Sequence, residues 1–238
     1  MQRIKIVGVL VLLFISSNLY SQKKRDKIEY LSNFDMKTVR WGFYLGLNDS
    51  DFKISYKNKD LYPEAIDRIL TETSLGFNVG LLGDLRLHKN VNLRLEPGLY
   101  YNKKTVIFNY LAEESAKKRD AESTFMYVPL LMQFSADRYR NIRPYVAAGV
   151  AYGHNFTSNY DDQDDNSSNH FRLQANNYFY ELGIGMDFYF YFFKFSPSLR
   201  GVFAINNELQ YDEKSDSPWT APIGYLGTRA IFLRLTFQ

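Results

Sequence analysis

The stretch NYFYELGIGMDFYFYFFKFSPSLRGVFAIN, residues 177–206, decides the fold class. In its first half every second residue from Tyr178 to Phe190 is apolar, and the intervening positions include Glu181, Gly183, Gly185 and Asp187. This period of two is typical of a strand and excludes a helix. The alternation resumes after a turn near Tyr191 and Phe192, which predicts a long hairpin with one apolar and one polar face. Each arm exceeds the roughly ten residues that a tilted strand needs to cross a bilayer, so we interpret the stretch as a membrane hairpin.

The same alternation recurs along the chain, interrupted by connections that are alternately short and long. Besides the hairpin, it predicts strands at residues 40–48, 74–87, 91–108, 126–134, 144–155 and 223–238. The long connections are expected at residues 49–73, with a helical turn at 64–70, and at 109–122, 156–175 and 207–222. We therefore predict an all-β fold, an eight-stranded antiparallel up-and-down transmembrane β-barrel. Both termini would lie at the short-turn end, in the periplasm of an outer membrane, and the long loops would be extracellular.

Residues 1–21 resemble a secretory signal peptide, because Arg3 and Lys5 precede an apolar run that is too short to span a membrane. Residues 22–39 follow as an arm without sustained alternation, which we expect to be mobile or loosely docked in the periplasm, and residues 40–238 form the barrel. Removing the signal leaves 27 basic and 26 acidic residues, so the charge gives no reason to expect nucleic acid as a partner. The chain has no cysteine and hence no disulfide or thiolate metal site.

Alternation alone does not say which face is outside, since a soluble lipocalin-like barrel shows the same pattern inside out. Long strands, glycines that share a face with charges, and aromatic residues near strand ends favour lipid outside. The expected interfacial aromatics are Trp41, Tyr44, Tyr101, Phe108, Tyr152, Tyr178, Tyr189, Phe193 and Phe195. The partners are then the bilayer and lipopolysaccharide of the outer membrane.

If lipid is outside, the charged residues of the polar face fill a narrow lumen. The predicted structural network consists of Arg94, Glu96, Glu181, Asp187 and Arg200, and we expect Asp84, Arg86, Lys194 and Arg234 to join it. Mutual ion pairing that keeps the barrel rigid is the first interpretation, and a proton or solute path is the alternative. No motif for a cofactor or a metal is found.

Two other constellations were weighed as sites. The acidic run from Asp161 to Asp165 lacks the glycine and the final glutamate of an EF-hand, so it predicts a solvated loop and not a calcium site. His154 and Ser158 near the outer rim invite comparison with barrel acyltransferases that modify lipid A, but the sequence shows proximity alone. We therefore predict a protein that is not an enzyme.

Four segments carry a family resemblance: EPGLYYNKK (96–104), FMYVPLLMQF (125–134), RPYVAAGVAYG (143–153) and ELGIGMDFYFYFFKFSPSLRGVFAINN (181–207). They resemble PorT/SprT-type outer-membrane β-barrels of the Bacteroidetes type IX secretion system, within the wider outer-membrane β-barrel family. The resemblance implies a role in exporting proteases, adhesins and gliding-motility proteins, with type IX secretion components as partners. Such barrels usually end in an aromatic residue, whereas here Phe237 is followed by Gln238. An alternative function is a passive surface barrel that mediates adhesion through its long loops.

Overall fold

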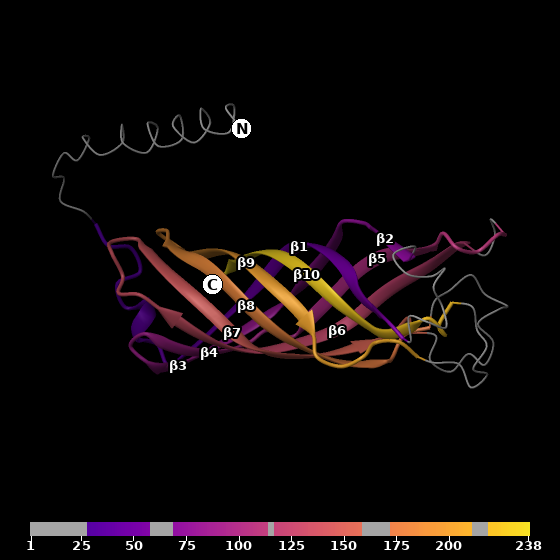
Figure 1. Ribbon diagram of the computed structural model, residues 1–238. Coiled ribbons are helices and arrows are strands. Elements are labelled where there is room, and N and C mark those ends of the chain that lie inside the picture. Colours follow the sequence, from indigo (N-terminus) through magenta and orange to yellow (C-terminus); the bar gives the residue numbers. More distant parts are fainter. Residues whose placement is uncertain (1–27, 58–68, 114–116, 159–171, 211–218) are drawn as a thin grey trace, which may run out of the picture.

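The chain folds into a ring of antiparallel strands that closes on itself (Figure 1). The computed structural model describes residues 28–57, 69–113, 117–158, 172–210 and 219–238. The strands are β1 (Val39–Tyr56), β2 (Ile69–Thr73), β3 (Gly76–His88), β4 (Val91–Leu95), β5 (Gly98–Phe108), β6 (Lys118–Ser135), β7 (Ile142–Asn155), β8 (Asn176–Tyr189), β9 (Lys194–Ala204) and β10 (Ile223–Phe237). A 3-10 helix, η2 (Phe34–Met36), precedes them.

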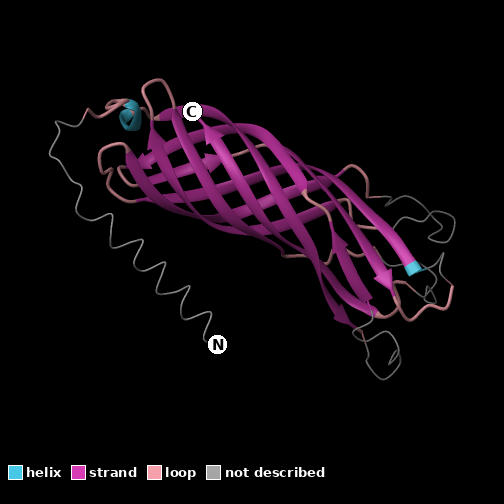
Figure 2. Ribbon diagram, turned by 90° about the horizontal axis from the view of Figure 1, so that it is seen from above, coloured by secondary structure: helices cyan, strands magenta, loops and turns pink. Residues whose placement is uncertain are grey.

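The ten strands form an eight-stranded barrel, because β2 and β3 together make one interrupted barrel strand, and β4 and β5 make another. Each barrel strand pairs with its neighbours in the sequence, and the pairing of β1 with both β3 and β10 closes the ring. The strands run obliquely to the barrel axis (Figure 2), as closure requires. The eight-stranded up-and-down barrel predicted from the sequence is therefore confirmed.

The apolar face of the strands lies outside. Trp41 is 75% exposed, and the outward leucines, isoleucines and valines of the barrel strands form an apolar belt. Interfacial aromatics stack along this belt, for example Phe43 on Phe237 with ring centroids 5.2 Å apart. The expectation was wrong for Tyr44, Phe108 and Tyr189, which point into the interior because they lie on the inward parity of their strands.

The apolar belt does not reach the long-loop ends of several strands. On β1 the outward residues change from Leu47 to Asp49, and on β5 they change from Tyr101 to Lys103. Beyond these points the strands continue, so the predicted loops at 49–73 and 109–122 are in part wrong: β1 reaches Tyr56, β2 begins at Ile69, and β6 begins at Lys118. Residues 64–68 of the predicted helical turn lie outside the described part, and residues 69 and 70 are strand.

The strand extensions beyond the belt enclose a second apolar core. The β1–β3 ladder ends at the Asn48–Gly76 pair. From there to the long-loop end, the described residues of β1 pair with β10 alone. The extensions of β1 and β10 on one side and of β2, β5 and β6 on the other pack together with three residues of the connections, Leu173, Leu209 and Trp219. The strand residues of this core are Phe52, Ile69, Val106, Phe108, Ala121, Ile223 and Leu226. We call these ten residues together the outer core. It fills the long-loop end of the barrel.

The predicted strand at 91–108 is interrupted at Glu96 and Pro97 because Pro97 has no N–H to donate. The register does not change across the interruption, since Leu81 donates to the Pro97 carbonyl and Glu96 to the Pro129 carbonyl. Inside this wall, Gly98 makes room for the Tyr44 ring: a Cβ there would lie 2.3 Å from the Tyr44 hydroxyl. That hydroxyl donates to the Glu96 carbonyl at 3.2 Å.

Among the described residues, the structure contains no helix of the length and apolarity needed to cross a membrane. The predicted signal peptide, residues 1–21, lies outside the described part of the chain.

Candidate functional site

The middle of the lumen is occupied by a carboxylate held between arginines. Glu96, at the interruption between β4 and β5, accepts two hydrogen bonds from Arg200 on β9, at 2.7 and 2.9 Å. It accepts a third from Arg234 on β10, at 2.6 Å. Glu181 on β8 lies 3.5 Å from the Arg200 guanidinium and accepts from the Tyr127 hydroxyl at 2.6 Å. All these side chains are fully buried, so charge compensation has to come from within the group.

A second ionic group lies nearer the short-turn end. Asp84 accepts from Arg40 at 2.9 Å and from Arg94 at 3.2 Å. Asp187 accepts from Ser196 at 2.5 Å and lies 3.5 Å from Lys194 Nζ.

Gln238 extends the ladder past Phe237, because its backbone exchanges two hydrogen bonds with Lys194. Its side-chain oxygen also accepts from Arg94 at 3.4 Å. The residue that departs from the expected aromatic end is therefore part of the wall.

The five residues predicted as a lumen network are all buried inside the barrel: Arg94, Glu96, Glu181, Asp187 and Arg200. Of the residues expected beside them, Asp84, Lys194 and Arg234 are buried too, whereas Arg86 is half-buried near the end of β3. Arg40 and Arg143 are buried as well and were not among the predicted lumen residues. The parity of their strands carried the signal, since both alternate with outward apolar residues.

An aromatic layer closes the lumen above the ionic groups. Tyr100, Phe125, Tyr127, Phe179 and Phe232 are almost fully buried and pack against one another with ring centroids 4.9 to 6.0 Å apart. With the outer core above this layer and the ionic groups below it, side chains occupy the barrel along its length. A small barrel is expected to be filled in this way.

The short-turn mouth is closed by the N-terminal arm, of which residues 28–38 are described. The Tyr189 hydroxyl donates to the carboxylate of Asp35 in η2 and lies 2.8 Å from both of its oxygens. The same carboxylate lies 3.4 Å from Arg40, 3.6 Å from Arg143 and 3.7 Å from Arg138. The sequence analysis left open whether the arm is mobile or loosely docked. In the structure its described part is docked, while the basic residues of 23–27 lie outside the described residues.

A buried polar relay lies beyond the belt, beneath the outer core. Lys104 on β5 donates to the Thr228 hydroxyl at 2.8 Å, and this hydroxyl donates to Glu208 at 2.6 Å. Burial lowers the pKa of Lys104 to about 8, opposed by the nearby Glu208 and Asp51. Burial likewise raises the pKa of Glu208, opposed by Lys104 and by the Thr228 hydrogen bond. Each partner therefore makes the charge of the other tolerable.

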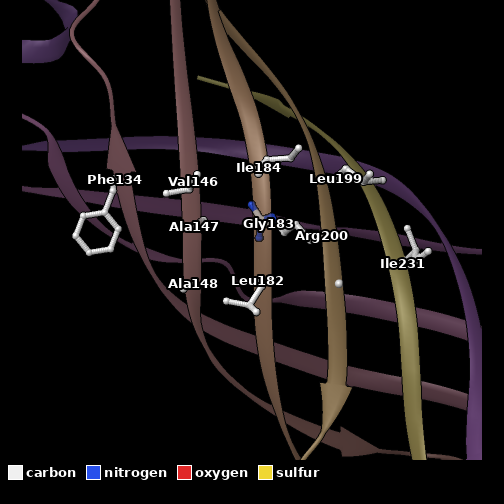
Figure 3. A pocket seen from close by; sticks show the side chains of 11 residues that line it. Phe134, Val146, Ala147, Ala148, Leu182, Gly183, Ile184, Leu199, Arg200 and Ile231 are labelled. Atoms are coloured by element: carbon white, nitrogen blue, oxygen red, sulfur yellow. The ribbon is translucent and has the colours of Figure 1, made fainter. Parts of the chain in front are cut away.

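The outer wall carries a shallow groove inside the apolar belt (Figure 3). It has a volume of about 500 Å³ and runs across β6 to β10, where the small Ala148 and Gly201 lie among Phe134, Val146, Leu182, Ile184, Leu199 and Ile231. Because its lining is apolar and faces the hydrocarbon region, acyl chains of the bilayer match it chemically.

The residues weighed for lipid chemistry do not form a catalytic arrangement in the described part of the chain. The His154 ring lies on the outer side, 2.9 Å from Asn176 Oδ1, whereas Ser158 is buried. The acidic run from Asp161 to Asp165 lies outside the described residues. Where the structure is described, no three His, Cys, Asp or Glu side chains are grouped so as to hold a metal ion.

Comparison with known proteins gives one family and several solved structures. A sequence model of the family described as outer membrane protein beta-barrel domain matches residues 20–210. The structure is similar to that of the outer membrane protein OprG from Pseudomonas aeruginosa, with 17% identity over 84% of this chain and 90% of OprG and a TM-score of 0.43. It is also similar to outer membrane protein AlkL in lipid bilayers, with 12% identity over 92% of this chain and 94% of AlkL and a TM-score of 0.44.

A third similar structure is Ail, the attachment invasion locus protein of Yersinia pestis, in complex with a heparin analogue. Its identity is 11% over 83% of this chain and 96% of Ail, and its TM-score is 0.37. A search of curated proteins finds no significant match.

Proposed function

This chain belongs to the outer membrane protein beta-barrel domain family, and from its sequence resemblance within that family we propose that it is a non-enzymatic outer-membrane component of type IX protein secretion. In this role it would support the export of proteases, adhesins and gliding-motility proteins. The short-turn end would face the periplasm and the long loops the cell exterior.

The filled lumen is the observation that carries this proposal. Glu96, Arg200 and Arg234 meet at its centre, and the aromatic layer around Tyr127 lies directly above. A passage for solutes or unfolded protein would have to break buried ion pairs, at about 3–5 kcal/mol for each one broken. A barrel closed in this way acts through its surfaces. This favours an accessory component that contacts other envelope proteins over a conducting pore.

The type IX assignment itself is supported by the sequence resemblance. The most specific segment, residues 181–207, forms β8, β9 and their turn, which contribute Glu181, Asp187 and Arg200 to the lumen. The resemblance thus includes inward residues that build the closed interior as well as the lipid-facing ones.

A clean deletion in the native bacterium, complemented in trans, tests the proposal. We expect secreted proteases and adhesins to accumulate inside the deletion strain and to return to the medium on complementation. Porins and other barrels in the same membrane serve as controls for general envelope damage. Normal export in the deletion strain would overturn the assignment.

A second candidate function is adhesion through the long-loop end. The observation in its favour is the outer core, which holds the strand extensions of β1, β5, β6 and β10 rigid beyond the belt. Outward ion pairs decorate these extensions, such as Lys103 with Glu122 at 2.9 Å. Shortening the long loops separates the two candidates: an adhesin loses binding to cells or glycans while secretion stays normal.

A further inference from the structure

The contacts at the short-turn mouth bind the arm as a peptide. The Asn141 side-chain amide accepts from the Tyr30 N–H at 2.9 Å and donates to the Ile28 carbonyl at 3.0 Å. The Arg138 guanidinium donates to the carbonyls of Tyr30 and Leu31. Four backbone groups of three residues are thus recognised by two side chains of one turn, whatever side chains the peptide carries. An inorganic anion has no N–H to donate and could not use the Asn141 side-chain oxygen.

The same mouth also selects a carboxylate. The Asp35 carboxylate lies against Arg40, Arg138, Arg143 and Tyr189. Arg40 has Asp84 as well, whereas in the described residues Asp35 is the carboxylate within ion-pair distance of Arg138 and Arg143.

The wall of the barrel supplies an excess of positive charge on this side. The buried basic residues from the ionic groups to the mouth number six, namely Arg40, Arg94, Arg143, Lys194, Arg200 and Arg234, against four acidic ones, Asp84, Glu96, Glu181 and Asp187. Buried charges require partners, so the wall alone is incomplete without an acidic group from outside it.

The arm is held mainly by polar contacts, with two aromatic contacts beside them: the Tyr30 ring lies edge-on 5.9 Å from the exposed Tyr191 ring, and the half-buried Phe34 ring faces Arg40 and Lys194. No residue of η2 is buried, and Ile28 and Met36 are each 71% exposed. Leu31 has a φ of 52°, a left-handed conformation that is strained for leucine. Because no described residue of 28–38 is fully buried, the arm can leave at the cost of polar and half-exposed aromatic contacts, which another peptide can replace.

We propose that the short-turn mouth is a binding site for an acidic peptide segment of a partner protein, which the chain's own arm occupies in cis through Asp35. The partner segment presents a backbone turn like that of residues 28–31 to Asn141 and Arg138 and, four to five residues further on, a carboxylate to Arg143. This inference deepens the proposed function by giving the chemistry of a periplasmic partner, and it rests on that function only for the location of the mouth.

The test uses the full-length chain refolded in detergent and a fluorescent peptide with the sequence of residues 28–36, IEYLSNFDM. The variant D35N weakens the internal arm and vacates the carboxylate position. By fluorescence anisotropy we expect D35N to bind the peptide at least tenfold more tightly than the wild-type chain does. Adding R143Q to D35N, or replacing the aspartate of the peptide by asparagine, should each weaken binding by tenfold or more.

A second measurement avoids variants. Excess peptide should displace the arm of the wild-type protein and speed trypsin cleavage at Lys37, whereas the asparagine peptide should not. Equal binding of the two peptides, or no acceleration of cleavage and no binding to folded D35N, would overturn the proposal. Because neither readout depends on secretion, these outcomes are independent of whether the deletion strain exports its cargo.

Discussion

Replacing Glu96 by glutamine tests whether the lumen is a charge-compensated core. The substitution keeps the size of the side chain and removes one negative charge from a position that three guanidinium hydrogen bonds share. Hydrogen bonds to charged groups contribute about 1.5–3 kcal/mol each, and a glutamine oxygen retains part of them. Breaking a buried ion pair by removing one partner costs about 3–5 kcal/mol, which is the loss that we expect for E96Q.

The assay is urea unfolding in detergent, in which the difference in gel mobility between unheated and boiled samples reports the folded fraction. With a urea dependence of about 2 kcal/mol per M, the midpoint of unfolding should fall by about 2 M. The matched control is E122Q, which removes a carboxylate that is 45% exposed and paired with Lys103 on the outer surface. There we expect a loss of about 1 kcal/mol or less.

A double variant separates charge from shape. Adding R234M to E96Q removes one of the guanidinium groups left without a carboxylate, and part of the lost stability should return. If E96Q costs no more than E122Q, Glu96 is solvated in the lumen. The reasoning that the barrel is closed by buried ion pairs would then be refuted.

Three further predictions concern other parts of the barrel. G98A should cost about 1–3 kcal/mol in unfolding because its methyl would meet the Tyr44 hydroxyl, while G83A, which faces the movable Trp41 ring, should cost less. In the wild-type protein the free energy of unfolding should rise between about pH 8 and the ordinary lysine pKa of 10.5, because in this range Lys104 is protonated in the unfolded chain and neutral in the folded one. K104M should remove this rise, which urea midpoints measured across the range would show. W219A should speed proteolysis of the long-loop end and leave the heat-dependent gel shift intact, because the cavity that the substitution creates lies in the outer core.

The strand pattern was sufficient to predict the barrel and most of the inward charges, because in a closed sheet every second residue points inside. It was not sufficient to predict which charges pair. Arg200 on β9 reaches Glu96 across the lumen, while its ladder partners are Gly183 on β8 and Phe232 on β10. Such cross-lumen pairs depend on strand tilt and stagger, which a single sequence does not encode in any local motif.

The strand extensions were missed because the alternation changes phase. Within the belt the outward residues are apolar, as at Leu45 and Leu47, whereas beyond it the inward residues are apolar, as at Phe52. If the apolar residues are expected on the outward positions throughout, their switch to the inward positions resembles the end of a strand. The arm was predicted, but its docking through Asp35 was not, because Asp35 lies in a segment without periodicity and its contacts are with arginines more than a hundred residues away.

The two ends of the barrel differ in what it takes to open them. Opening the long-loop end would expose the ten buried side chains of the outer core, at about 1.5–3 kcal/mol for each large one. The total exceeds the stability of a typical domain, so this end opens only on unfolding. Releasing the arm from the short-turn end exposes no buried residue of η2 and exchanges polar contacts for others. In the proposed role in secretion, a contact that forms and releases repeatedly is therefore compatible with the short-turn mouth, whereas the long-loop end is suited to a permanent surface.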